Sequence, residues 1–222
     1  MKINLLILLF TAVISGNHIF AVEMDWTQWR GPNRDGVVTG KIWPNDLKAA
    51  HLAPKWRVEL GSSYSGPIMN GDTVYVTESS GDNEVVRALD RTNGKEKWRH
   101  TWAGKMSVPF FAAKNGSWIR STPALANGKL FVAGMRDHLL CIDIKTGKRL
   151  WEINFPKEQK TPIPSFGCVC SPMADDKYVY MQAGAAFCKI EQDTGKMVWQ
   201  SMKDKGGMYG SAFASPVFAT LR

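Results

Sequence analysis

An acidic residue, a Gly-Lys pair and a Trp recur three times along the chain at fixed spacing. In each copy the Gly follows the acidic residue by four positions, and the Trp follows the Gly by four. The copies end at Trp98, Trp151 and Trp199, so 53 and 48 residues separate one Trp from the next. Because three residue types at fixed offsets do not recur three times by chance, the chain is built from a repeated unit.

Each unit has the pattern of four short strands. A Pro ends the first strand, a β-branched and aromatic run such as 72–77 forms the second, and the acidic residue closes the third and fixes a turn. Asn-Gly-Lys or Thr-Gly-Lys then makes a tight hairpin, and the fourth strand carries the Trp. We therefore predict an all-β fold, a β-propeller of four-stranded antiparallel blades. The blades are expected at about 63–101, 119–154 and 167–202, with the start of another at 210–222.

The repeated Trp is expected to lie between neighbouring blades. A four-stranded blade has two apolar faces, and stacking blades around an axis buries both of them. A Trp buries ~150–250 Å² of surface, which suits it to this boundary. Residues 54–60 look like a fourth strand that lacks its three predecessors. The blade-docking residues are predicted to be Trp56, Trp98, Trp151 and Trp199.

The repeat resembles that of the quinoprotein family. Asp-x-x-x-Gly-Lys followed by Trp, at 90–98 and 143–151, is similar to the repeat of dehydrogenases that use pyrroloquinoline quinone and of the propeller scaffold of outer-membrane protein assembly. The opening Trp26-Thr-Gln-Trp-Arg-Gly-Pro-Asn-Arg-Asp-Gly36 looks like the start of an exported branch of such proteins. The resemblance implies seven or eight blades, so we expect an incomplete ring of about three and a half blades, a fragment of a longer protein. A natural half-propeller that dimerises is the alternative.

The first 21 residues have the layout of a secretory signal peptide. Lys2 precedes the apolar stretch 3–14, and Ala21 offers a small residue for cleavage. No later apolar run approaches the ~20 residues that a membrane span requires. We therefore expect a periplasmic or secreted protein with a signal peptide at 1–21, an N-terminal extension at 22–53 and the partial propeller at 54–222.

The net charge of +8 does not indicate a nucleic-acid partner. The 28 Lys and Arg residues are scattered and mostly follow turn glycines, with no dense run. Export also argues against nucleic acid. The oligomeric state is not indicated by the sequence.

Quinone chemistry is not expected of this chain alone. It needs Ca²⁺ held by oxygen ligands and a carboxylate base, yet the first strands, at 63–69, 119–125 and 167–174, contain no Asp or Glu. The resemblance implies two adjacent cysteines beside the quinone, whereas this chain has Cys168-Val-Cys170. Pyrroloquinoline quinone and calcium would thus need ligands from further blades. The four cysteines are interpreted as packed free thiols, with a strained 168–170 bridge or a redox role as alternatives; isolated histidines argue against a metal site.

The loops between blades are the expected binding surface. Such loops emerge near the axial face, where propellers bind partners. We predict a non-catalytic binding or scaffold module that contacts a protein or polymer; the alternative is a fragment of a quinone- and calcium-dependent dehydrogenase. Arg120 could hold a carboxylate or a quinone oxygen, or pair with a backbone carbonyl. The partner-facing candidates are Trp118, Arg120, Ser121, Cys168, Cys170 and Tyr209.

Overall fold

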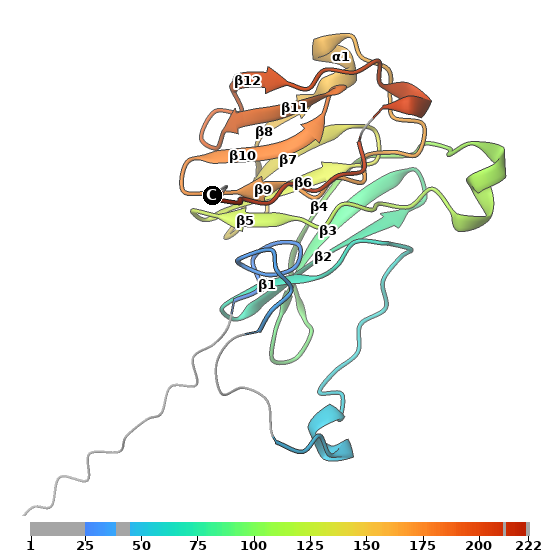
Figure 1. Ribbon diagram of the computed structural model, residues 1–222. Helices are drawn as coiled ribbons and strands as arrows, with labels where there is room; N and C mark the ends of the chain where they lie inside the picture. The colour runs from blue at the N-terminus through green and yellow to red at the C-terminus, as the bar shows by residue number, and fades with distance from the viewer. Residues whose placement is uncertain (1–24, 39–44, 211, 221–222) are drawn as a thin grey trace, which may run out of the picture.

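The computed structural model describes residues 25–38, 45–210 and 212–220, and the expected signal peptide at 1–21 lies outside them. The described part of the chain forms three four-stranded antiparallel sheets (Figure 1), which confirms the predicted all-β class and blade type. The first sheet consists of β1 (Ile68–Asn70), β2 (Thr73–Ser80), β3 (Asn83–Asp90) and β4 (Glu96–Ala103). The second consists of β5 (Ala124–Ala126), β6 (Lys129–Gly134), β7 (His138–Asp143) and β8 (Arg149–Asn154). The third consists of β9 (Met173–Ala174), β10 (Tyr178–Ala183), β11 (Ala186–Glu191) and β12 (Met197–Ser201).

Short helices lie in the segments around these sheets. They are η1 (Ala49–Leu52), η2 (Phe110–Asn115), α1 (Phe155–Gln159) and η3 (Gly207–Tyr209). None of the helices in the described ranges is long and apolar enough to cross a membrane.

The middle sheet is apolar on both faces, which explains the stacking. In β6, Leu130 and Val132 belong to an apolar cluster shared with the first sheet, whereas Phe131 and Ala133 belong to one shared with the third. Successive strand residues point to opposite faces, so a continuous apolar run supplies both clusters. The second sheet is therefore held between the other two, as Figure 1 shows.

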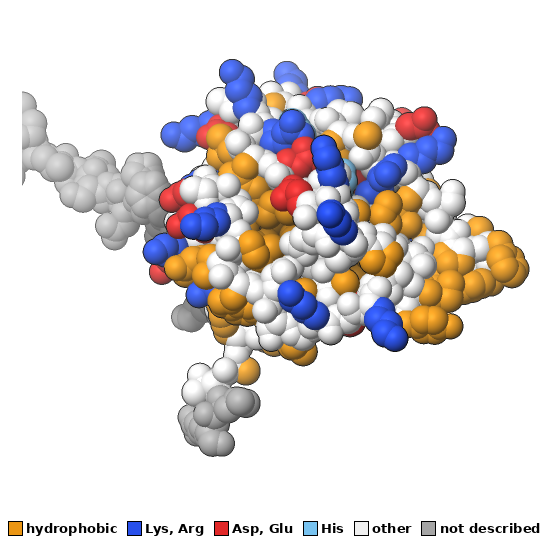
Figure 2. Space-filling model, turned by 90° about the horizontal axis from the view of Figure 1, so that it is seen from above, with side chains coloured by type: hydrophobic (Ala, Val, Ile, Leu, Met, Phe, Trp, Pro, Cys, Tyr) orange, Lys and Arg blue, Asp and Glu red, His pale blue; other side chains and the backbone are white. Residues whose placement is uncertain are grey.

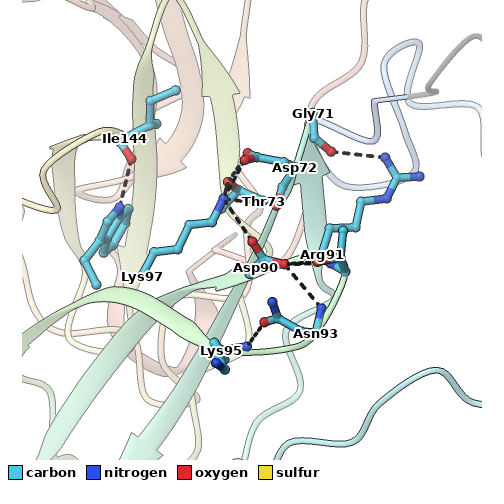
Figure 3. A network of polar contacts seen from close by, with 11 residues as sticks. Gly71, Asp72, Thr73, Asp90, Arg91, Asn93, Lys95, Lys97 and Ile144 are labelled. Carbon is cyan, nitrogen blue, oxygen red and sulfur yellow. Dashed lines mark hydrogen bonds and ion pairs between the residues drawn. The ribbon is translucent and has the colours of Figure 1, made fainter. Parts of the chain in front are cut away.

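The acidic residue of each repeat fixes its hairpin. Asp90 Oδ1 accepts hydrogen bonds from the N–H groups of Thr92 and Asn93 at 2.9 and 3.2 Å. Lys97 on β4 then reaches back to Asp72 and Asp90 (Figure 3). The hydrogen bond from the Thr92 hydroxyl, together with these contacts, lowers the pKa of Asp90. Its carboxylate thus serves the turn, as the sequence indicates.

Each repeat Trp that has a following sheet donates its indole N–H to that sheet. The acceptor is always the carbonyl three residues before the repeat Gly, and the carbonyl of Ile144 is drawn in Figure 3. A Cβ on Gly147 would lie 2.8 Å from the Trp98 ring, so this position needs a glycine for packing as well as for its φ of 71°. The pairs are Trp56 with Arg91, Trp98 with Ile144 and Trp151 with Gln192, each at 2.8 Å.

Residues 54–60 depart from the expected fourth strand. The segment forms no strand, although Trp56 packs on Gly94 as Trp98 and Trp151 pack on the glycines of the following repeats. A fourth strand is one that forms a ladder of backbone hydrogen bonds with a third strand. Among the described residues, 54–60 belong to none of the three sheets and have no such partner strand. Trp199, on β12 of the last sheet, is 39% exposed.

Candidate functional site

The residue before the Pro of each repeat joins one sheet to the next at their inner edge. The N–H of Gly66 donates to Thr122 Oγ1 at 2.9 Å, and the N–H of Thr122 donates to Ser171 Oγ at 3.0 Å. The N–H of Ser171 donates in turn to Ser215 Oγ at 2.9 Å. Ser215 therefore bonds to the third sheet in the same way that Ser171 bonds to the second. These bonds bring the starts of the inner strands together into a hub.

An N-terminal arm, residues 25–38, crosses the hub. Trp26 forms an antiparallel bridge with Met69, and the N–H of Leu125 donates to the carbonyl of Thr27 at 2.8 Å. Arg34 donates to the carbonyls of Ser171 and Pro172 at 3.1 and 2.9 Å. The arm thus contacts the inner edge of all three sheets, an arrangement that the sequence did not predict.

Arg34 holds the arm in place. Its side chain is 3% exposed, and burial lowers its pKa to about 10, so it stays charged at neutral pH. Its guanidinium carbon lies 5.3 Å from the centroid of the Trp29 ring, in a cation–π contact. Trp29 is thereby fixed at the hub.

Beside the arm is the hub pocket, of about 410 Å³. Its wall combines aromatic rings, hydroxyl groups and one guanidinium, with no carboxylate among its described lining residues. The lining consists of Trp29, Tyr64, Gly66, Arg120, Thr122, Val169, Ser171, Phe213 and Ser215.

Arg120 gives the hub pocket its positive charge. Its Nη2 donates a hydrogen bond to the carbonyl of Gly116 at 3.0 Å. This is the pairing with a backbone carbonyl that the sequence analysis gave as one of two possibilities. Its guanidinium carbon lies 5.0 Å from the centroid of the Tyr64 ring. Its Nε is buried and has no hydrogen-bond partner among the described residues. Arg120 lines the hub pocket, so its guanidinium is the group there that can pair with an anionic oxygen.

The other predicted candidates lie in three different settings. Trp118 is 37% exposed and its ring lies 5.4 Å from that of Tyr64, so it extends the wall beside Arg120. Tyr209, in η3, is 93% exposed. The remaining three are fully buried: Ser121, whose Oγ donates to the carbonyl of Cys170 at 2.9 Å, Cys168 and Cys170.

The cysteines pack as free thiols. All four lie in the apolar cluster between the second and third sheets, without a disulfide. Burial raises the pKa of Cys170 to about 12, so its thiol stays protonated. Neither Cys168 nor Cys170 lines the hub pocket; Val169 between them does.

The residues of the hub pocket do not fit calcium. Ca²⁺ takes six to eight oxygen ligands with carboxylates among them, and no Asp or Glu is present in the pocket lining. The described ranges also contain no group of three His, Cys, Asp or Glu residues placed to hold a metal. The Arg120 guanidinium, in contrast, fits an anionic oxygen.

An aromatic rim, with three of its four rings exposed, lies on the loops that follow the three described sheets. The ring centroid of Phe111 lies 5.5 Å from that of Phe110 and 6.1 Å from that of Phe166. The ring centroids of Phe166 and Phe213 are 5.8 Å apart. In the view of Figure 2, hydrophobic side chains gather on the projection at the right, while Lys and Arg are spread over the face in view. The rim consists of Phe110, Phe111, Phe166 and Phe213.

Comparison with known proteins gives one family and several relatives. A family model described as outer membrane protein assembly factor BamB matches residues 82–220. The chain is 32% identical over 137 residues to a 1-butanol dehydrogenase (cytochrome c) of Thauera butanivorans, covering 57% of this chain and 18% of that protein. It therefore spans about a fifth of that relative.

Two solved structures share the fold. The quinohemoprotein alcohol dehydrogenase of Comamonas testosteroni matches with a TM-score of 0.56 and 21% identity, over 79% of this chain and 27% of that one. BamB of Moraxella catarrhalis matches with a TM-score of 0.51 and 21% identity, over 68% of this chain and 45% of that one. The same blades thus occur in an oxidoreductase and in an assembly factor, so fold alone does not decide the function.

Proposed function

This chain belongs to the repeat family described as outer membrane protein assembly factor BamB, and from that premise we propose that it is part of an exported, non-catalytic binding or scaffold propeller. The hub pocket and the aromatic rim are the proposed contact surface for a protein partner. The observation that carries the proposal is the pocket wall, which offers aromatic rings, hydroxyls and the Arg120 guanidinium but no carboxylate among its described residues. Such a wall can bind and orient, but it has no general base.

The chemistry of this surface favours a peptide segment that carries a carboxylate. Arg120 would receive that carboxylate, with Ser171 and Ser215 as hydroxyl neighbours on the same wall. The rim would bury apolar side chains of the segment, since Phe110 and Phe111 are 90% and 61% exposed. Aromatic and Arg side chains are those that most often dominate protein interfaces.

The second candidate is a portion of a quinone- and calcium-dependent dehydrogenase. The similarity to a 1-butanol dehydrogenase supports it. It requires that parts of the protein beyond these sheets supply the calcium ligands and the base, because the hub pocket supplies neither. We therefore rank it below the binding module.

Site-specific photo-crosslinking in the full-length protein tests the proposal. A benzophenone side chain at Phe111 is expected to give a discrete adduct with one partner, and Arg120→Ala should weaken that adduct. The matched control is the same side chain at Leu150, which is 51% exposed on β8 of the second sheet. Dye-linked alcohol oxidation by full-length protein reconstituted with quinone and Ca²⁺ would instead establish the dehydrogenase.

Export is a separate part of the proposal and has its own test. The sequence layout of residues 1–21 supports cleavage near Ala21 and a periplasmic or secreted location. Mass spectrometry of protein recovered from the fractionated host should give a mature chain that begins at or near Val22. Recovery of the uncleaved chain from the cytosol would reject export.

A further inference from the structure

The lining of the hub pocket follows one rule of sequence position. Apart from Trp29, each described lining residue lies either one or three positions before the Pro of a repeat. Because successive residues of an extended segment point to opposite sides, these two sets face the axis and the residue between them faces away. The residues one position before Pro are Gly66, Thr122, Ser171 and Ser215. The residues three positions before Pro, which we call the axial residues, are Tyr64, Arg120, Val169 and Phe213.

The positions one and two residues before Pro serve the joints between sheets. The hydroxyl oxygens of Thr122, Ser171 and Ser215 accept the N–H bonds that connect each sheet to the next. Thr122 and Ser171 are also buried, as are Ser121 and Cys170, which precede them. A new side chain at either position therefore disturbs a joint before it changes the pocket.

The axial residues, in contrast, have side chains that reach the pocket without a part in these joints. Tyr64 and Phe213 are exposed, and Arg120 and Val169 are half-buried. The bonds that connect the sheets use backbone N–H groups and the hydroxyls one position before Pro, not an axial side chain. Each repeat thus presents one side chain to a ligand.

The axial residues divide the hub pocket into a cationic half and an apolar half. Arg120 and Tyr64 form the cationic half, with the guanidinium carbon 5.0 Å from the ring centroid. The N–H of Val169 donates to the carbonyl of Ala212 at 3.2 Å, which places Val169 next to the segment that carries Phe213. Val169 and Phe213 form the apolar half, and Phe213 also belongs to the aromatic rim, so this half continues into the rim.

We propose that the axial residues determine which peptide the hub pocket accepts, an inference that rests on the proposed binding function. Arg120 selects an acidic residue, and Val169 with Phe213 selects a bulky apolar residue two positions away in the peptide. Side chains two apart in an extended peptide lie on the same side, about 7 Å from each other, so one segment contacts both halves. A second acid in the apolar half loses its water without gaining a partner, so Val169 excludes it.

Peptide binding to the full-length protein tests this assignment. The probe is the peptide Gly-Gly-Asp-Gly-Phe-Gly-Gly, capped at both ends so that Asp carries its only charge, and binding is measured by surface plasmon resonance with the protein immobilised. Replacement of the peptide Asp by Asn, or of the peptide Phe by Asp, should weaken binding to the wild type roughly tenfold. The first change removes a charge-assisted hydrogen bond, and the second removes a buried ring.

Val169→Arg should reverse this preference, so that the Asp-Gly-Asp peptide binds more tightly than the Asp-Gly-Phe peptide. Phe213→Arg should give the same reversal from the neighbouring side chain, which keeps the test valid if Val169→Arg does not fold. Val198→Arg is the matched control and should keep the wild-type preference. Val198 is exposed on β12 and is outside the lining of the hub pocket, so the same charge is added away from the ligand.

The results separate this inference from the proposed function. Suppose that Arg120→Ala abolishes binding, while Val169→Arg and Phe213→Arg both keep the wild-type preference for the Asp-Gly-Phe peptide. The specificity assignment is then overturned and the binding module stands. Equal binding of the Asp and Asn peptides to the wild type, or no binding at roughly 1 mM peptide, would overturn the assignment as well. In that case the crosslinking at Phe111 decides the binding module independently.

Discussion

The indole Nε1 of Trp98 donates a 2.8 Å hydrogen bond to the carbonyl of Ile144, in the hairpin of the next sheet. The same side chain packs against Gly147, three residues further on. One Trp therefore both covers apolar surface and fixes the position of the neighbouring hairpin. Because the pairing repeats with Trp151 and Gln192, it sets the spacing between successive sheets.

A comparison of Gly147 with Gly128 separates two costs of replacing a glycine, the steric clash of the new side chain and the strain of the backbone conformation. Their φ values are 71° and 72°, but a Cβ on Gly147 would lie 2.8 Å from Trp98, whereas a Cβ on Gly128 meets no atom within 4 Å. Gly128→Ala should cost about 1–2 kcal/mol through its left-handed backbone alone. Gly147→Ala should cost about 1–3 kcal/mol more because it displaces the Trp98 ring. Urea unfolding measures both, and equal losses would reject the packing role.

Removal of a Trp that contacts the next sheet should lower the free energy of unfolding more than removal of Trp199, on the last described sheet. Trp151→Ala should lower the free energy of unfolding by about 3 kcal/mol, since the ring and its bond to Gln192 are both lost. Trp199 is 39% exposed and packs on Phe187 of its own sheet, so Trp199→Ala should cost roughly 1 kcal/mol. Denaturant titration of the two variants compares them; a larger loss at position 199 would contradict this ranking.

Glu84 should make the protein less stable as the pH rises. Burial raises its pKa from 4.5 to about 7. Between these values the folded state holds a proton that the unfolded state has released, so the stability that Glu84 contributes is present below about pH 4.5 and is lost as the pH rises through 7. The full loss is about 3 kcal/mol.

Glu84→Gln isolates this effect because Gln cannot ionise. Unfolding free energies measured at pH 5 and pH 8 should fall more steeply for the wild type than for the variant. Asp137, His100 and His138 titrate in both proteins, so their contributions cancel in the difference. Parallel pH profiles would show that Glu84 is not the source of the dependence.

Arg34→Ala should release the N-terminal arm from the hub. The variant loses the bonds to Ser171 and Pro172, and Arg34→Lys should restore them poorly because Lys lacks the two-pronged donor geometry. Hydrogen exchange at the Leu125 N–H, which is bonded to Thr27, should become about 5- to 30-fold faster, as a loss of about 1–2 kcal/mol of local stability predicts. Unchanged protection of Leu125 in both variants would rule out this role for Arg34.

The sheets could be predicted from sequence because their determinants are local. A Gly at positive φ, an acidic residue that caps the turn and a Trp on the strand that follows lie within nine residues of one another, as from Asp90 to Trp98. The arm could not be predicted in this way. Arg34 and Pro172 are 138 residues apart, and nothing near Arg34 in sequence indicates that partner.

Part of the hub pocket could be predicted from the sequence, again because local position along the chain indicates some residues and not others. Arg120 and Trp118 were expected near the axis because they precede an inner strand, and they lie beside the hub pocket. Cys168 and Cys170 share one side of an extended segment, but alternation does not say which side faces the pocket. The structure places Val169 there instead. Tyr64 and Trp29 were not proposed, since their place depends on contacts with other sheets and with the arm.

Exchange of the indole N–H protons tests the stacking of the sheets most directly. In a two-dimensional NMR spectrum of the ¹⁵N-Trp-labelled protein, the nine tryptophans give assignable indole signals. The signals of Trp98 and Trp151, both bonded to carbonyls of the next sheet, should exchange slowly, and that of Trp199, with no such bond among the described residues, should exchange rapidly. Exchange of all three at the same fast rate would show that the tryptophans do not join one sheet to the next.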